Sequence, residues 1–221
     1  MQRTRKDKVA ARYFDSISYL WDNLYQDRGG WLMRWANRKF RKDIWTRFEW
    51  VMKELGPHDP CSILDIGCGN GVYCVELAKR GHGPITAIDI SPRMALATRR
   101  NVEAAGVSGV MILQGDGIYG QEVGVHDVAL AIGVFDYIGD PLAALRAIRD
   151  KCRLRLLATF PKRRTWRAPV RKIRLTLKGC PVYFYTAEQV QTLARAAGWA
   201  GVRLTELECI YCADLLCAPG T

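Results

Sequence analysis

Short apolar runs alternate with longer, more polar segments through the middle of the chain. Four runs rich in aliphatic and β-branched residues have the length of buried strands, and they lie at residues 63–66, 85–90, 110–113 and 126–132. The segments between them are long enough for crossover helices, and glycine or proline marks several boundaries. This alternation predicts an α/β fold, a doubly wound and mostly parallel sheet with helices on its faces.

The pattern changes on the N-terminal side of this core. Residues 1–56 carry aromatic and apolar side chains at helical intervals until a Gly-Pro pair stops the pattern. We expect a helical cap that belongs to the same domain as residues 57–221. Five of the seven tryptophans lie in this cap. They either pack the cap against the sheet, which we expect for Trp45 and Trp50, or line a slot for a flat apolar substrate.

The C-terminal part contains a helix followed by two strands. Thr186 and Gln189 have the spacing of a capping box and predict the start of a helix that Gly198 ends. Residues 202–208 and 212–218 then have strand character. Because so few residues connect them, we expect an antiparallel pair.

The net charge of +11 is unevenly distributed. It amounts to +7 on residues 1–53, −2 on residues 54–160 and +6 on residues 161–221. Residues 161–181 form an insertion after the fifth strand with eight basic residues and no acid, which predicts a lid or surface that faces anions. We therefore expect an anionic or apolar small-molecule substrate, while nucleic acid and peripheral contact with a membrane remain open alternatives.

Cysteine usage and hydropathy restrict the class of protein further. The eight cysteines lack metal-ligand spacing, and even the Cys209-x-x-Cys212 pair has no second pair beside it. We expect reduced core cysteines and no metal site. No run reaches the roughly 18 apolar residues of a spanning helix. The expectation is a cytoplasmic protein, with peripheral membrane contact open and no obligate protein partner.

A glycine-rich turn after the first strand is the most specific signal in the chain. Residues 63–71 read ILDIGCGNG, an apolar strand that contains Asp65 and runs into three alternating glycines. Glycine permits positive φ and lets a ligand approach the main chain, and the N-terminus of the following helix then lies beside that ligand. A dinucleotide fingerprint is not met, because Val72 stands where its third glycine belongs.

Acidic residues end the next two strands. Asp89 ends the second strand, 20 residues after Gly69, where one carboxylate can accept hydrogen bonds from both hydroxyls of a ribose. Asp116 follows the third strand, and the fourth strand leads into residues 133–138, which read GVFDYI.

The glycine-rich turn, Asp89, Asp116 and residues 133–138 occur in the same order as in the class I S-adenosylmethionine-dependent methyltransferases. The chain resembles this family, whose motif I is D-x-G-x-G-x-G. The resemblance covers residues 54–160 and implies a seven-stranded Rossmann-like sheet with S-adenosylmethionine as cofactor. It also implies that Asp89 binds the ribose, that Asp116 binds the adenine amine and that residues 133–138 border the methionine moiety. The residues expected at the cofactor are Asp65, Gly67, Cys68, Gly69, Asp89, Ile90, Met94, Asp116, Gly117, Gly133 and Phe135.

A histidine base is not expected at such a site. The three histidines, His58, His82 and His126, precede strands, so they should lie at the edge opposite to the ligand. Methyl transfer tolerates this because the sulfonium donor is already activated, and a base matters for a hydroxyl but hardly for a carboxylate. If a base is used, the candidates are Tyr13, Asp15, Asp136 and Tyr137.

The flanking segments resemble the magnesium-protoporphyrin O-methyltransferases. The similarity lies in Tyr13-Phe14-Asp15, in Trp21 and Leu24-Tyr25, and in residues 157–162 with the basic insertion and aromatic triplet that follow. Enzymes of that family esterify a propionate carboxylate of a flat anionic pigment. We expect O-methylation of a small or lipid-like acceptor, such as a carboxylate on a metalloporphyrin. An RNA methyltransferase and a non-catalytic S-adenosylmethionine-binding scaffold are the alternatives.

Overall fold

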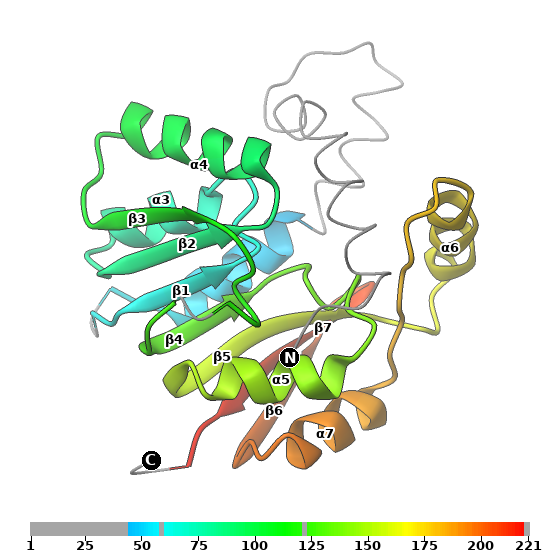
Figure 1. Ribbon diagram of the computed structural model, residues 1–221. Helices are drawn as coiled ribbons and strands as arrows, with labels where there is room; N and C mark the ends of the chain where they lie inside the picture. Colours follow the sequence, from blue (N-terminus) through cyan, green and yellow to red (C-terminus); the bar gives the residue numbers. More distant parts are fainter. Residues whose placement is uncertain (1–43, 58–59, 121–122, 219–221) are drawn as a thin grey trace.

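A seven-stranded sheet forms the centre of this computed structural model, which describes residues 44–57, 60–120 and 123–218 (Figure 1). The strand order is β3-β2-β1-β4-β5-β7-β6, and β7 runs antiparallel to both of its neighbours. This confirms the predicted mostly parallel sheet and its closing antiparallel pair. The strands are β1 (Ile63–Ile66), β2 (Ile85–Asp89), β3 (Val110–Gln114), β4 (His126–Ala131), β5 (Cys152–Pro161), β6 (Gly201–Glu206) and β7 (Ile210–Leu216).

Helices cover both faces of the sheet. The helical residues 44–54, together with α3 and α4, lie on one face, and α5 and α7 lie on the other (Figure 1). Every residue of β1 and β2 is buried, as expected for central parallel strands covered on both sides. The helices are α3 (Val72–Lys79), α4 (Pro92–Ala104), α5 (Pro141–Arg149), α6 (Arg167–Leu177) and α7 (Ala187–Ala196).

The predicted packing of the two tryptophans before β1 is half right. Trp50 is buried in the same core cluster as Leu77, whereas Trp45 is exposed and contacts Phe48 edge-on. Residues five apart on a helix point about 140° away from each other. Both rings therefore cannot face the sheet, and the prediction for Trp45 was wrong.

The sequence signals around α7 are confirmed. The Thr186 side chain accepts a hydrogen bond from the Gln189 main chain, and the Gln189 side chain accepts one from the Thr186 main chain. Gly198 follows the helix with a φ of 88°, a conformation that glycine adopts without strain.

The insertion after β5 contains α6, which stands beyond the edge of the sheet formed by the carboxyl ends of the parallel strands (Figure 1). Most of the cap predicted for residues 1–56, including Tyr13 and Asp15, lies outside the described residues. In the described part of the chain, no helix is long and apolar enough to cross a membrane.

Candidate active site

The loops after β1 to β4 meet at one edge of the sheet, because parallel strands all end on the same side. This edge brings together the glycine turn at residues 67–71, Asp89, Asp116 and the segment 133–138. The sequence had predicted this edge for all four segments, because each follows a strand and because the family resemblance implies it.

The glycine turn has the backbone that only glycine adopts easily. The φ angles of Gly67, Gly69 and Gly71 are 70°, 59° and 79°. A Cβ at Gly67 would lie 2.9 Å from Val134 Cγ2, and one at Gly71 would lie 2.7 Å from Thr98 Cγ2. At Gly69, an added Cβ would meet nothing within 4 Å, so the turn is tightly packed at both ends and open at its centre.

Helix α4 holds this turn from behind through polar side chains. Thr98 Oγ1 donates to the carbonyl oxygen of Gly69 at 2.8 Å, and Asn101 Nδ2 donates to that of Asn70 at 2.8 Å. Sequence reasoning missed both residues, since they lie 29 and 31 positions away from their partners. The Cys68 thiol also points back, with its Sγ 3.4 Å from Thr98 Oγ1.

Asp89 connects the turn to the end of β2. One carboxylate oxygen accepts from the Gly69 main chain at 3.0 Å, and the other accepts from the Ser91 main chain at 2.8 Å. Ser91 in turn caps α4 by accepting from the Met94 main chain. These main-chain donors fix the orientation of the carboxylate at the open centre of the turn. Met94 itself is buried, whereas the neighbouring Ile90 is half-buried.

Asp65 is buried inside the sheet, one strand away from Asp89. The Cys74 thiol of α3 donates to Asp65 Oδ2 at 3.1 Å. Burial raises the pKa of Asp65 from 3.8 to about 6, an effect that the Cys74 hydrogen bond opposes and the nearby negative charge of Asp89 reinforces. Burying Asp65 therefore costs more folding free energy than burying an apolar residue at the same position would.

Asp116 and Gly117 shape the third loop. Asp116 Oδ1 accepts from the main chains of Ile118 and Tyr119, at 3.0 and 3.2 Å. A Cβ at Gly117 would lie 2.6 Å from Ile88 Cγ2. These contacts of Asp116 and Gly117 hold the loop in place. The predicted contact with adenine stays a prediction.

The loop after β4 is held by the end of β5 and by Tyr185, which follows β5 in the chain. Gly133 has a φ of 77° and donates from its main chain to Thr159 Oγ1 at 2.8 Å. The Phe135 ring is fully buried and stacks on Phe160, while its carbonyl oxygen accepts from the Tyr185 hydroxyl. The ring therefore supports the loop from below, and the contact of Phe135 with the cofactor stays a prediction.

Two candidates for a general base, Asp136 and Tyr137, are joined by one arginine of the lid. Arg171 Nη2 lies 2.5 Å from Asp136 Oδ2 and donates to the Tyr137 hydroxyl at 2.9 Å. Asp136 is 2% exposed. Burial raises the pKa of Tyr137 to about 12, although the charge of Arg171 opposes this rise. Sequence reasoning had not singled out Arg171 among the basic residues of the lid.

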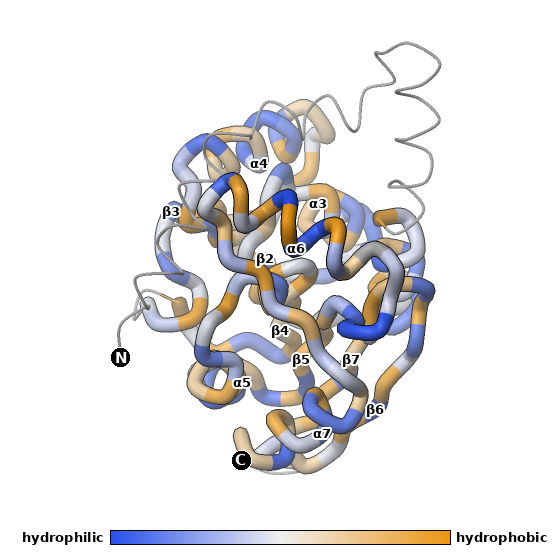
Figure 2. The backbone as a smooth tube through the Cα atoms, turned by 90° about the vertical axis from the view of Figure 1, so that its right-hand side faces the viewer, coloured by the Kyte–Doolittle hydropathy of each residue, from blue (hydrophilic) through white to orange (hydrophobic). Residues whose placement is uncertain are grey.

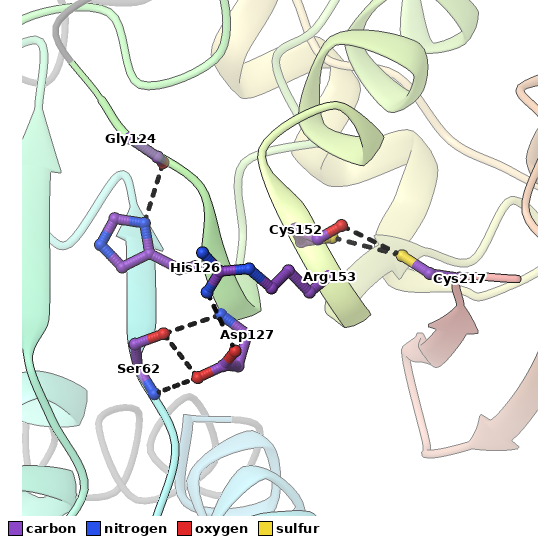
Figure 3. Close-up of polar contacts among 7 residues, drawn as sticks. All are labelled: Ser62, Gly124, His126, Asp127, Cys152, Arg153 and Cys217. Atoms are coloured by element: carbon purple, nitrogen blue, oxygen red, sulfur yellow. Dashed lines mark hydrogen bonds and ion pairs between the residues drawn. The ribbon is translucent and has the colours of Figure 1, made fainter. Parts of the chain in front are cut away.

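The described histidines lie at the opposite edge, as predicted. His126 opens β4, where its ring contacts the Gly124 carbonyl oxygen (Figure 3). The other ring nitrogen, Nε2, lies 2.9 Å from Thr86 Oγ1. In the same region, Asp127 accepts from the main chain and hydroxyl of Ser62. His82 precedes β2, and its Nδ1 lies 3.5 Å from Cys61 Sγ. His58 is outside the described residues.

Residues 5–204 of the chain match the methyltransferase domain family. The chain belongs to this family. It is an S-adenosylmethionine-dependent methyltransferase by family.

Individual relatives of this methyltransferase cover only part of its length. It is 40% identical over 91 residues to human EEF1A lysine methyltransferase 2, and 28% identical over 103 residues to the ubiquinone biosynthesis O-methyltransferase of Xanthomonas axonopodis. These alignments span 40% and 46% of this chain, but only 38% and 42% of the relatives.

A solved structure shares nearly the whole fold of this methyltransferase. It is the magnesium protoporphyrin IX methyltransferase of Synechocystis PCC 6803 with bound S-adenosylhomocysteine, with a TM-score of 0.75 and 16% identity. The match covers 96% of this chain and 99% of that one, so it extends beyond the nucleotide-binding core. At this identity it shows the fold.

The described residues fit the cofactor of the family. The open centre of the turn at Gly69 and the oriented carboxylate of Asp89 form one continuous polar rim, joined by the bond between them. Residues of this rim would hold S-adenosylmethionine, which brings a methyl group on an already activated sulfonium.

Proposed function

We propose that this methyltransferase acts at oxygen, on the ionised carboxylate of a flat or apolar anionic acceptor such as a metalloporphyrin. One observation carries the proposal: Arg171 engages both described candidates for a general base. Asp136 is paired with the guanidinium, and Tyr137 has a pKa of about 12 and keeps its proton. Tyr13 and Asp15, outside the described residues, stay predictions.

The nucleophile follows from the state of these groups. A hydroxyl or an ammonium must lose a proton before it attacks a methyl group, so its enzyme needs a base. A carboxylate has lost that proton in solution, and the enzyme then only has to align it with the methyl group. In this chain, Asp89 and the glycine turn position the donor, while Arg171 holds the loop that borders the acceptor.

Charge supports an anionic acceptor. Arg163, Arg164 and Lys172 are exposed on the lid, close in sequence to Arg171, and residues 161–181 contain no acid. These positive charges on the lid attract a carboxylate substrate by long-range electrostatics. The magnesium protoporphyrin acceptor named for the Synechocystis enzyme has the same chemistry, and we adopt it as the first substrate to test.

The experiment is transfer of label from methyl-labelled S-adenosylmethionine. The purified full-length protein is incubated with magnesium protoporphyrin IX, with metal-free protoporphyrin IX or with total RNA. The proposal expects an organic-soluble product that releases its label in base, as an ester does. Asp89→Ala is the control, because it should reduce labelling through weaker cofactor binding. Label released by ribonuclease would assign the enzyme to RNA and contradict the proposal.

Asp136→Asn tests the absence of a base separately. We expect the variant to keep most of its kcat at saturating substrate, because Asp136 is a positioning residue here. General bases contribute roughly 10²–10⁴-fold to rates. A loss of that size in a variant that still binds S-adenosylmethionine and keeps the Tm of the wild type would make Asp136 the base and favour a hydroxyl acceptor.

A further inference from the structure

Helix α6 exposes a row of large apolar side chains on its outer side. Trp166, Val170, Ile173 and Leu177 are 66%, 60%, 63% and 83% exposed. Their spacing of four, three and four residues places them along one face of a helix. We call the three residues within the helix, Val170, Ile173 and Leu177, the outer row.

The opposite face of α6 is the one that contacts the protein. Ala168 and Leu175 are buried there, and Arg171 reaches the loop after β4. These residues lie about 130–190° around the helix from the outer row. The outer row is therefore a second apolar surface, separate from the packing that holds α6 in place, and Figure 2 shows α6 at the front of the molecule.

Positive charge surrounds the outer row. Arg163 and Arg164 precede the helix, and Lys172 and Arg174 lie on its exposed sides. No acidic residue occurs between residues 161 and 187. A helix with an aliphatic face bordered by lysine and arginine is the type that lies in the interface of a membrane with anionic lipids.

We propose that the outer row of α6 docks on an anionic lipid bilayer. Charge argues against the chain's own N-terminal part as the cover, because residues 1–53 carry a net charge of +7 and would repel the lid. A second copy docked through the same face would meet the same repulsion. RNA would use the basic residues but gain little from Val170, Ile173 and Leu177, since it binds through phosphate contacts and base stacking.

Docking would place the site next to the bilayer. The helix that carries the outer row also carries Arg171, which holds Asp136 and Tyr137. An acceptor that partitions into lipid could then reach the site without crossing water. The docking proposal itself does not depend on which acceptor is methylated.

The test is co-sedimentation of the full-length protein with vesicles, without any acceptor. Vesicles of phosphatidylcholine mixed with phosphatidylglycerol are compared with pure phosphatidylcholine, at low and high salt. The test variant is Val170→Ser, Ile173→Ser and Leu177→Ser combined. The matched control combines Leu96→Ser, Met111→Ser and Leu154→Ser, three side chains with similar exposure elsewhere on the surface. A charge variant combines Arg163→Gln, Arg164→Gln and Lys172→Gln.

We expect binding to the anionic vesicles that is at least tenfold weaker in the test and charge variants and unchanged in the matched control. Equal binding by the test variant and the wild type would overturn the proposal. Absence of vesicle binding would also overturn it. In that case, a lower Tm of the test variant would assign the row to a contact within the chain, and a change from dimer to monomer would assign it to a second copy. RNA binding lost only in the charge variant would assign the surface to nucleic acid.

Discussion

The buried acid Asp65 should make the protein lose stability as the pH rises from about 4 to about 6. Its pKa is raised by burial from 3.8 to about 6. Between these values the folded protein keeps the proton while the unfolded chain releases it. The unfolded state then binds fewer protons than the folded state, so the free energy of unfolding decreases with rising pH.

The size of the effect follows from the shift. A difference of about two pKa units corresponds to about 3 kcal/mol over the full titration, of which about 2 kcal/mol falls between about pH 4.5 and about pH 7. Asp65→Asn removes the titration and keeps an acceptor for the Cys74 thiol. The free energy of unfolding of the wild type should therefore fall by about 2 kcal/mol relative to the variant over this range.

Urea denaturation at several pH values, without added S-adenosylmethionine, measures the difference. Asp127→Asn is the control, because hydrogen bonds from Ser62 lower the pKa of Asp127. Its stabilising effect is lost only as the pH falls below about 4, so its difference from the wild type should be flat in the same window. If the curves of the wild type and Asp65→Asn run parallel, Asp65 titrates as in an unfolded chain and the argument from burial fails.

Three further predictions concern the cofactor rim and the C-terminal helix. Asp89→Ala should weaken S-adenosylmethionine binding by about 1.5–3 kcal/mol, measured by calorimetry, because charged hydrogen bonds are lost; unchanged affinity would remove Asp89 from the ribose site. Gly71→Ala should destabilise the fold by about 1–3 kcal/mol through positive φ and the contact with Thr98 Cγ2. Adding Thr98→Ser, which deletes that methyl group, should recover part of the loss in urea, and no recovery would leave φ as the whole cause. Thr186→Ala should cost about 1 kcal/mol in unfolding free energy by removing the capping box, whereas Thr186→Ser should not.

The sequence contained most of the fold and of the cofactor rim because these signals are local. The glycine turn, Asp89 and Asp116 each lie at the end of a strand and are recognised by their residue type. Because the strands are parallel, their ends lie at one edge of the sheet. The capping box of α7 spans only three residues. Trp45 was misplaced because an apolar side chain in an amphipathic helix was assumed to face the core, whereas the helical phase turns it to solvent.

Contacts between residues that are far apart in the sequence could not be predicted, because only the tertiary structure brings those residues together. Thr98 reaches the glycine turn from α4, and Arg171 reaches Asp136 across 35 positions. Among eight basic residues of the lid, only the fold distinguishes the inward-facing Arg171 from the exposed Lys172. The burial of Phe135 likewise depends on Phe160 and Tyr185, which approach from later segments.

Arg171 connects the two proposals through a single side chain. Its guanidinium pairs with the carboxylate of Asp136, and this pairing is the ground on which the proposed function makes Asp136 a positioning residue. The same pairing fixes α6, because breaking it would leave a buried charge uncompensated, at a cost of about 3–5 kcal/mol. A lid held this firmly presents its outer row in a defined direction, so the arrangement that suits a carboxylate acceptor also orients the molecule on a surface from which an apolar acceptor would come.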